Sequence, residues 1–388
     1  MAGGPAERQA WITLASVRFV GEETFGQLLA TFGSAGASLA AALDGRLDTW
    51  ISERRAHDGR APMPRPVRDD VVAAAADPGT VLDPIGELGL WSLTPLDSDY
   101  PARLRDLDPP PSVIHGLGDP QALHGPRAVA VVGTRRPTPA GRALAARICA
   151  RLVECRVTVV SGMAIGIDGV AHASTVERNG TTVAVIGAGH HAPGPRAHAR
   201  LAAEIIGSGG AMISEHHPTT RATKGTFPRR NRIIAALADA VVVIEAPIHS
   251  GARITAGRAF ELGRPVFVAP GRVGDWSTAG SLALLRETPA SPLVGLDELV
   301  EDLGYLGPPD GDPSAQLGHS REPALSLLGP AEREVARRLD DGPAGLDELV
   351  FSTGLSPGVV SSAVTLLLMR GWIQQVGAAY MPAGPLAE

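Results

Sequence analysis

Six short apolar runs, alternating with stretches of helical spacing, constrain the fold of this 388-residue chain more than any other feature. The runs cover residues 128–132, 157–160, 182–186, 211–214, 240–245 and 265–269. They are rich in Val and Ile along their whole length, which is typical of strands buried on both faces of a sheet. The repetition predicts an α/β fold with a Rossmann-like, doubly wound, mostly parallel sheet. Such a sheet binds ligands outside the carboxyl ends of its strands.

The composition changes on both sides of these runs and predicts further domains. Residues 1–75 have apolar residues at helical spacing and predict a small helical module. Residues 76–305 form the predicted Rossmann-like domain, with its core starting at 127. A polar, Pro- and Gly-rich linker is predicted over 306–323. The pattern over 324–388, helices followed by an alternating hairpin, predicts a winged-helix-like domain.

Positive charge is concentrated in the middle of a chain whose formal net charge is −6. Residues 127–271 hold 18 Lys and Arg against 8 Asp and Glu, whereas the rest hold 17 against 33. This excess indicates a polyanionic ligand, with a solvated arginine-rich surface as the alternative. From residue 323 onward there are 4 arginines against 7 acids, so we interpret the winged-helix-like domain as a protein-contacting or regulatory module.

Glycine-rich turns follow three of the predicted strands at the edge where ligands bind. Their glycine and polar residues are Gly133, Thr134, Arg135, Ser161, Gly162, Ser250 and Gly251. Glycine permits close approach of the backbone, and hydroxyl and free N–H groups can bind an anion. None of these turns has the spacing of a dinucleotide site or a nucleotide-triphosphate loop, so no cofactor is predicted.

Cations surround an aromatic ring just before the fifth apolar run. The residues are Lys224, Phe227, Arg230, Asn231 and Arg232. Bases stack on aromatic rings while cations hold phosphates, so this composition favours single-stranded nucleic acid. The alternative is a helix start with Phe227 in the core.

Several short motifs occur in a fixed order along residues 90–305. They include Val-Gly-Thr-Arg at 132–135, Ser-Gly-Met-Ala at 161–164, Phe-Pro-Arg-Arg-Asn-Arg-Ile-Ile at 227–234 and Pro-Gly at 270–271. In these motifs the chain resembles the DNA-processing protein A (DprA/Smf) family of bacterial recombination mediators. It differs from the family pattern in the loop 187–195, where His191 and Gly194 replace an aspartate and a tyrosine.

The resemblance implies a homodimer that binds and protects single-stranded DNA in a basic pocket and loads the RecA recombinase during natural transformation. It implies no catalytic residue and no nucleotide hydrolysis. Carried over by position, the DNA contacts include Arg135, Lys224, Phe227 and the residues from Arg230 to Arg232. The resemblance also implies that the amino-terminal module is of the sterile-alpha-motif type.

Two alternative functions remain open at this point. One is a nucleotide-processing Rossmann enzyme of the lysine-decarboxylase-like type, although residues 250–255 lack the glycine run of its loop. Asp168, Glu215 and Glu245 lie near strand ends where a catalytic acid could act, but helix capping and arginine pairing also explain them. The other alternative is a DprA-like nucleic-acid sensor in genome defence.

Membrane and metal functions find no support in the sequence. There is no run of about 18 apolar residues and no signal peptide, so the chain is predicted to be cytoplasmic without a membrane partner. The histidine pairs at 190–191 and 216–217 have no third ligand at metal spacing, and no metal site is predicted.

Overall fold

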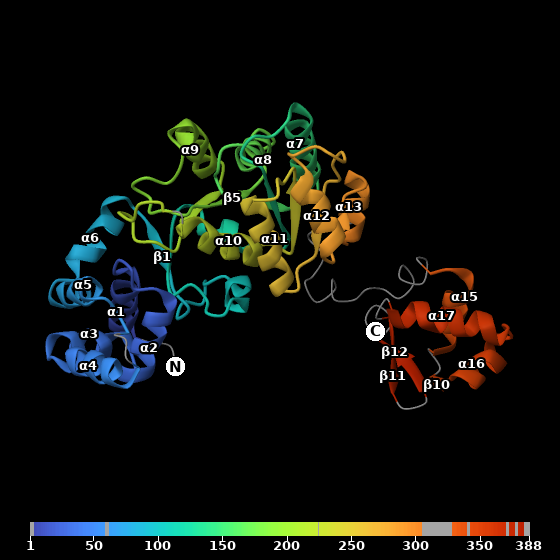
Figure 1. The fold of residues 1–388 in the computed structure, drawn as a ribbon, viewed down its shortest axis with the longest axis horizontal. Helices are drawn as coiled ribbons and strands as arrows, with labels where there is room; N and C mark the ends of the chain where they lie inside the picture. Colours follow the sequence, from blue (N-terminus) through green and yellow to red (C-terminus); the bar gives the residue numbers. More distant parts are fainter. Residues whose placement is uncertain are drawn as a thin grey trace. The chain divides into compact units, whose positions relative to one another are not determined.

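The computed structural model describes residues 4–58, 62–223, 225–304, 328–339, 342–369, 372–376 and 379–383. The chain divides into two compact units, Met1–Gly307 and Pro308–Glu388. Figure 1 shows the elements of both units, coloured along the sequence.

Six helices form the amino-terminal part of the first unit. They are α1 Pro5–Ser16, α2 Glu22–Phe32, α3 Ala35–Leu43, α4 Arg46–Asp58, α5 Arg65–Ala76 and α6 Gly79–Glu87. Their apolar faces meet in one core that includes Leu14, Phe25 and Leu28. Trp11 packs edge-to-face on Phe25, with the ring centroids 4.8 Å apart. The helical module predicted over 1–75 thus continues through α6.

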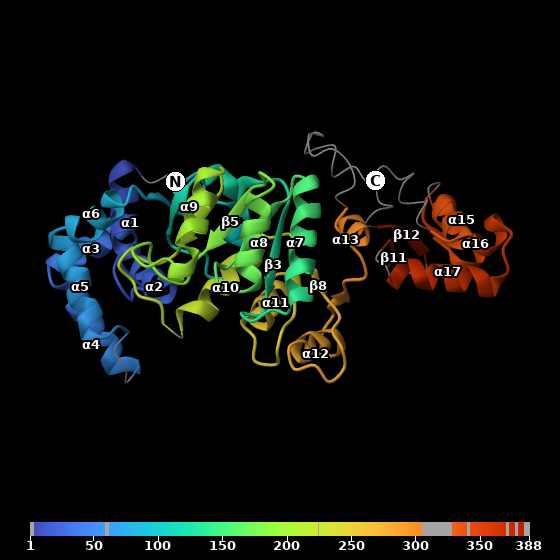
Figure 2. The same ribbon diagram turned by 90° about the horizontal axis from the view of Figure 1, so that it is seen from above.

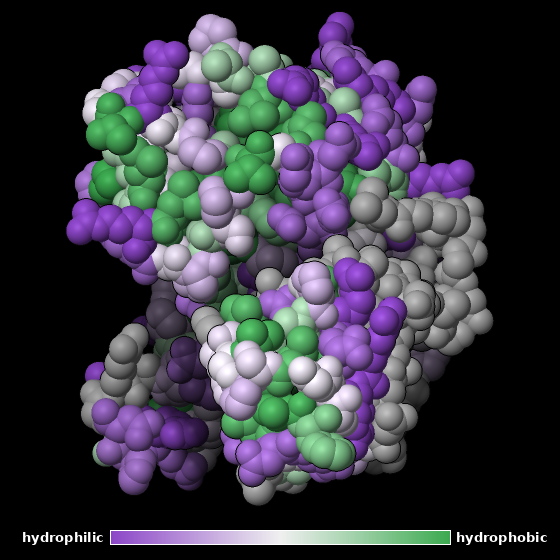
Figure 3. Space-filling model, turned by 90° about the vertical axis from the view of Figure 1, so that its right-hand side faces the viewer, coloured by the Kyte–Doolittle hydropathy of each residue, from purple (hydrophilic) through white to green (hydrophobic). Residues whose placement is uncertain are grey.

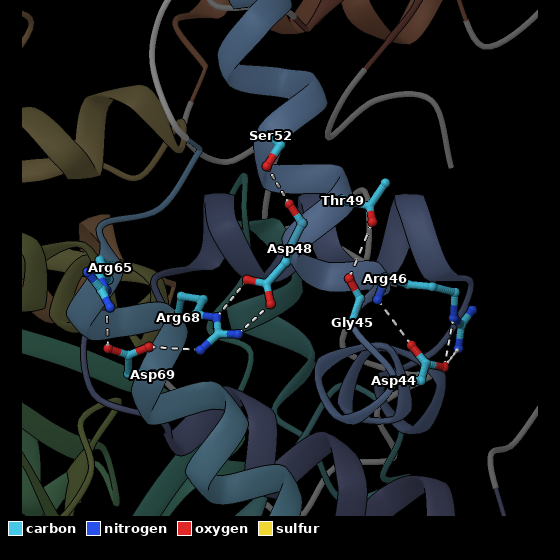
Figure 4. A network of polar contacts seen from close by, with 9 residues as sticks. All are labelled: Asp44, Gly45, Arg46, Asp48, Thr49, Ser52, Arg65, Arg68 and Asp69. Atoms are coloured by element: carbon cyan, nitrogen blue, oxygen red, sulfur yellow. Dashed lines mark hydrogen bonds and ion pairs between the residues drawn. The ribbon is translucent and has the colours of Figure 1, made fainter.

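Arginine and aspartate side chains form a polar network on the outside of α4 and α5, drawn in Figure 4. Arg68 donates hydrogen bonds to both carboxylate oxygens of Asp48 and to Asp69. Arg46 pairs with Asp44 at 2.8 Å. Exposed pairs of this kind stabilise a fold by at most about 1 kcal/mol each. Because its cations and carboxylates balance, this network offers no net positive charge to a phosphate.

A nine-stranded sheet forms the centre of the first unit, in the order β1-β2-β6-β5-β4-β3-β7-β8-β9. The strands are β1 Trp91–Leu93, β2 Ile114–Gly118, β3 Ala128–Gly133, β4 Thr158–Ser161, β5 Thr182–Val185, β6 Ala211–Ser214, β7 Ala240–Ile244, β8 Val266–Val268 and β9 Ser291–Pro292. Pairings from β6 to β9 are parallel, and β1 and β2 are antiparallel at one edge. The predicted doubly wound, mostly parallel sheet is confirmed, and the six predicted strands match β3 to β8.

Helices cover both faces of this sheet (Figures 1 and 2). Val129 and Val131 of β3 pack into the core of one face, and Ala130 and Val132 into the other, because successive strand residues point in opposite directions. The first face carries α7 Pro139–Glu154, α8 Ile167–Val176, α9 Ala199–Gly207 and α13 Leu296–Asp302; the second carries α10 Thr226–Leu237, α11 Gly251–Glu261 and α12 Ala279–Glu287. The chain runs outward from β3 in one direction and then returns to β7 on the other side. The strand order therefore reverses between β3 and β7, where such sheets bind ligands.

The second unit is a winged-helix domain. Its elements are α15 Pro330–Arg338, β10 Ala344–Gly345, α16 Leu346–Thr353, α17 Pro357–Met369, β11 Ile373–Val376 and β12 Ala379–Pro382, and β12 lies between β10 and β11 in the sheet. Residues 357–369 contain no charged side chain. Phe351, Val359 and Leu366 are exposed, and Figure 3 shows apolar side chains gathered on one face of this unit. α17 therefore has no side-chain cation with which to contact a phosphate.

Among the described helices, no single one is long and apolar enough to cross a membrane. Two sharply bent pairs have the length and composition for it when taken together. These pairs are α2 with α3 and α16 with α17.

Candidate nucleic-acid interface

A cavity of about 740 Å³ opens at the carboxyl ends of β3 and β7. Its wall combines the turns that follow these two strands with the beginning of α10. The lining includes Gly133, Thr134, Arg135, Arg136, Asp168, Phe227, Arg230, Asn231, His249, Ser250, Gly251 and Trp276. This cavity, the switch-point pocket, lies at the position where a doubly wound sheet binds its ligand.

The turn after β3 is held tightly against the end of β7. A Cβ on Gly133 would lie 2.0 Å from the carbonyl oxygen of Ile244, so only glycine fits there. The backbone N–H of Thr134 donates to the carbonyl of Glu245 at 2.9 Å. Arg135, next in the chain, is exposed at the tip of this anchored turn. Its guanidinium is therefore free to meet a ligand while its backbone is fixed.

Phe227, near the start of α10, lies directly beside Arg135. The guanidinium carbon of Arg135 is 5.4 Å from the centroid of the half-buried ring, within cation–π range. Both residues also line a second cavity of about 210 Å³, the side pocket, together with Gly162 and parts of the loop 187–195. The ring thus borders two cavities, with a cation next to it. A base can stack on such a ring while the cation meets the neighbouring phosphate.

Arg230, three residues after Phe227, also lines the switch-point pocket and is taken as its floor because it is the more buried of the two. It is only 5% exposed, and it donates hydrogen bonds to the carbonyls of Gly162 and Val185. Burial lowers the pKa of Arg230 to about 10, and burial also raises the pKa of Asp168 nearby. Asn231 continues the floor, because its side-chain amide donates to the carbonyl of Gly251 at 3.1 Å. These contacts connect α10 to β4, β5 and α11.

Arg229 and Arg232 lie on another side of α10 and contact the amino-terminal helices. Both pair with Glu22 at the start of α2, and Arg232 also pairs with Glu215. Both carboxylates are largely buried, and burial raises the pKa of Glu215. A Cβ on Gly21 would lie 3.1 Å from the Arg229 guanidinium, so glycine lets the turn between α1 and α2 approach α10 closely. These arginines join the helical module to the sheet domain.

The amino terminus of α7, where a Rossmann fold commonly binds phosphate, is already occupied by a carboxylate of the chain itself. Glu245 accepts hydrogen bonds from the backbone N–H of Thr138, at 2.8 Å, and from the Thr138 hydroxyl. A Cβ on Gly141 would lie 2.4 Å from this carboxyl group, so glycine makes room for it. A phosphate at this helix terminus would meet a negative charge instead of free N–H groups.

The structure brings eight of the twelve predicted DNA-binding residues into the wall of the switch-point pocket: Gly133, Thr134, Arg135, Phe227, Arg230, Asn231, Ser250 and Gly251. Gly162 lines the side pocket instead. Ser161 is fully buried and its hydroxyl donates to the carbonyl of Val131 at 2.7 Å. Arg232 lies in the ion-pair cluster with Glu22. Lys224 lies outside the described residues.

Sequence reasoning missed Trp276 and did not distinguish the arginines of α10. Helical spacing could have separated them, because residues three or four apart share a face. Phe227, Arg230 and Asn231 follow this spacing on the pocket side, and Arg229 and Arg232 follow it on the module side. Trp276 had a weaker signal, as an aromatic residue seven positions after the end of the last predicted strand. In the described part of the chain, no group of three His, Cys, Asp or Glu residues could hold a metal ion.

Three family profiles match consecutive parts of the sequence. The family described as DNA recombination-mediator protein A matches residues 91–304. A DprA-like N-terminal HHH domain matches residues 5–43, and a DprA winged helix domain matches residues 319–378. The sterile-alpha-motif likeness of the amino-terminal module stays a prediction.

Individual relatives agree with these profiles. The putative DNA processing protein DprA of Mycobacterium tuberculosis is 38% identical over 296 residues, covering 72% of this chain and 73% of the relative. Protein Smf of Escherichia coli is 34% identical and covers 74% of this chain and 76% of that protein. The structure of DNA processing protein A from Streptococcus pneumoniae superposes with a TM-score of 0.54 at 29% identity, covering 68% of this chain and 95% of that one. The structure of the Helicobacter pylori protein, described for its single-stranded DNA binding mode, has a TM-score of 0.50 at 27% identity. The match covers 55% of this chain and 95% of the Helicobacter pylori chain.

Proposed function

Because this chain belongs to the DNA recombination-mediator protein A (DprA) family, we propose that it binds single-stranded DNA in the switch-point pocket and acts without catalysis. The observation that carries this proposal is the pairing of the Phe227 ring with the Arg135 guanidinium in the wall of one open cavity. The ring offers a face to an unpaired base, and the cation offers charge to the phosphate beside it. The Helicobacter pylori relative, described for single-stranded DNA binding, supports the same ligand.

The other residues of the pocket fall into two proposed roles. Thr134, Ser250 and Gly251 offer hydroxyl and backbone groups to the strand, as does Gly162 in the side pocket. Arg230 and Asn231 support the pocket from below, since their polar groups already bond to the chain. Lys224 and Arg232 remain proposed phosphate contacts from the sequence; Arg232 would have to leave Glu22 and Glu215 to make one.

A competition binding assay between single-stranded and double-stranded DNA tests this proposal. In competition assays over a salt series, a single-stranded oligonucleotide should displace a duplex of the same length, because a duplex hides the base faces that stack on Phe227. Equal affinity for the two forms would contradict the proposal. An affinity independent of oligonucleotide length would instead support a mononucleotide site.

We further propose that the bound strand is delivered to the RecA recombinase by a homodimer of this protein, in transformation or general recombination in the cytoplasm. The family membership supports this proposal, and so does the distribution of charge along the chain. The basic residues concentrate in 127–271, whereas the rest of the chain is acidic and is available for contacts with other proteins. Substoichiometric protein should accelerate RecA assembly on strands already coated by single-strand-binding protein. Single-strand binding with no effect on RecA would favour the nucleic-acid sensor.

A nucleotide-processing enzyme is the second candidate function, and the contacts of the acidic residues argue against it. Glu245 caps α7, Asp168 accepts from the backbone of Ala164 at 3.2 Å, and Glu215 pairs with Arg232. Asp168 lines the switch-point pocket, but its carboxylate accepts this backbone hydrogen bond and lies near the Arg230 guanidinium, and Glu215 and Glu245 do not line that pocket. Structural contacts therefore account for all three acids. Incubation with nucleoside mono- and triphosphates should therefore release neither base nor phosphate.

Replacing Arg135 with alanine should weaken binding to all single-stranded sequences and reduce the salt dependence of binding. Loss of one phosphate contact lowers the slope of log K against log salt by about 0.7 on single strands. The slope is measured by titration over a salt series. Arg258→Ala is the matched control, because Arg258 pairs with Glu261 at 2.6 Å on α11 and does not line the pocket. An unchanged slope in folded Arg135→Ala protein would move the phosphate site elsewhere.

Removing residues 306–388 should leave single-strand affinity nearly unchanged. The first unit contains the whole switch-point pocket, and α17 of the second unit has no charged residue to hold phosphate. Equilibrium binding of the full chain and the truncated chain is compared at the same salt concentration. A loss above about tenfold, equivalent to about 1.4 kcal/mol, would show that the winged helix contacts DNA.

A further inference from the structure

Trp276 is an exposed aromatic residue in the wall of the switch-point pocket. It lies in the loop after β8, and 65% of its surface is accessible to water. An exposed aromatic ring in the wall of a cavity presents a face on which a ligand ring can stack. The short motifs at 132–135, 161–164, 227–234 and 270–271 do not include this residue.

The loop that carries Trp276 is pinned on both sides of the ring. The carboxylate of Asp275 accepts hydrogen bonds from the backbone N–H and the hydroxyl of Ser277, at 2.9 and 2.8 Å. Thr278 packs against Gly271, where a Cβ would lie 2.0 Å from the threonine side chain. The hydrogen bond from the Ser277 backbone also lowers the pKa of Asp275. A ring on such an anchored loop binds with little further loss of conformational entropy.

The two cavities lie next to each other along the carboxyl edge of the sheet, and each can be assigned to the strands whose ends line it. The side pocket lies at β4 and β5, the switch-point pocket lies at β3 and β7, and Phe227 borders both. Trp276 follows β8, the next strand outward. It lines the switch-point pocket but not the side pocket. From β4 to β8 there are three strand spacings, roughly 14 Å. Phe227 thus lines the switch-point pocket where it meets the side pocket, whereas Trp276 comes from the loop after β8.

We propose that Trp276 is a second base-stacking platform, so that single-stranded DNA runs along the carboxyl edge of the sheet from Phe227 to Trp276. This inference rests on the proposed function and adds a path and a second subsite to it. A neutral indole stacks on a base of any kind, which suits binding without sequence preference. Arg135 and Arg136, in the wall of the same pocket, supply the charge for the phosphates between the two rings.

The test compares Trp276→Ala, Trp276→Phe and the matched control Val273→Ala over a length series of oligothymidylates, from about 2 to about 16 nucleotides. Val273 is 93% exposed in the same loop and does not line the pocket. Trp276→Ala should weaken binding about 5- to 140-fold for strands long enough to reach both rings. The shortest strands, which occupy one ring, should bind as they do to the unchanged protein. Trp276→Phe should retain most of the affinity, and the salt slope should not change in any variant.

The outcomes separate this inference from the proposed function. If Trp276→Ala binds every length as tightly as the unchanged protein, while Phe227→Ala does not, the second subsite is wrong and the proposed function stands. A loss in Val273→Ala equal to that in Trp276→Ala would assign the effect to the loop backbone and overturn the role of the ring. If the unchanged protein does not prefer single strands over duplex, the proposed function itself fails.

Discussion

Arg230→Met is expected to lower the free energy of unfolding by about 3–5 kcal/mol, because it removes one partner of a buried charged group. The guanidinium is buried near Asp168 and donates to the carbonyls of Gly162 and Val185. Methionine fills the space but donates no hydrogen bond, so both carbonyls lose their donor and Asp168 loses the nearby positive charge. Urea denaturation followed by circular dichroism measures the change.

The control and the pH dependence make this prediction specific. Arg258→Met, which removes an exposed arginine paired with Glu261, should change stability by no more than about 1 kcal/mol. Burial raises the pKa of Asp168 in the folded protein, and loss of Arg230 should raise it further. A raised folded-state pKa contributes stability at low pH that is lost as the pH rises through that pKa. The deficit of Arg230→Met should therefore shrink as the pH falls, and a deficit independent of pH would contradict the buried pair.

Phe227→Ala is expected to weaken single-strand binding by about 1–3 kcal/mol, or about 5- to 140-fold. The ring borders both cavities, so its removal takes away the surface on which a base stacks. Duplex binding should change little, because paired bases do not expose their faces. Fluorescence anisotropy with single-stranded and duplex oligonucleotides measures both affinities.

Two variants distinguish stacking from a loss of packing. Phe227→Tyr keeps an aromatic face and should retain most of the affinity. Phe351→Ala removes a ring that is 90% exposed in the second unit and should have no effect. Equal losses for single strands and duplex in Phe227→Ala would show that the ring supports the domain instead of binding bases.

The order of elements in the central domain could be predicted from the sequence because its parallel strands are buried on both faces. Each of β3 to β8 therefore appears as an uninterrupted apolar run. Strand β2 was not predicted, because its sequence Ile-His-Gly-Leu-Gly contains no uninterrupted apolar run. Its His115 is fully buried, with hydrogen bonds to Ser16 and Ser92. Those partners come from distant parts of the chain, so no local pattern could indicate a strand there.

The place of the candidate site could also be predicted, since parallel strands bring their carboxyl ends to one edge. The turns at Gly133 and Ser250 meet there, and both line the switch-point pocket. The roles of neighbouring cations could not be assigned in the same way. Arg232 meets Glu22 at a separation of 210 residues, and Arg230 meets carbonyls of two other strand ends.

The sequence by itself determined the family, the central sheet and the concentration of positive charge, because these depend on residue type and local period. Tertiary structure alone decided how each of these cations is placed. Arg135, Arg230 and Arg232 carry the same guanidinium, yet one is exposed beside a ring, one is buried in the floor and one joins two domains. Burial and long-range partners make this difference, since they depend on packing between segments that are far apart in the chain.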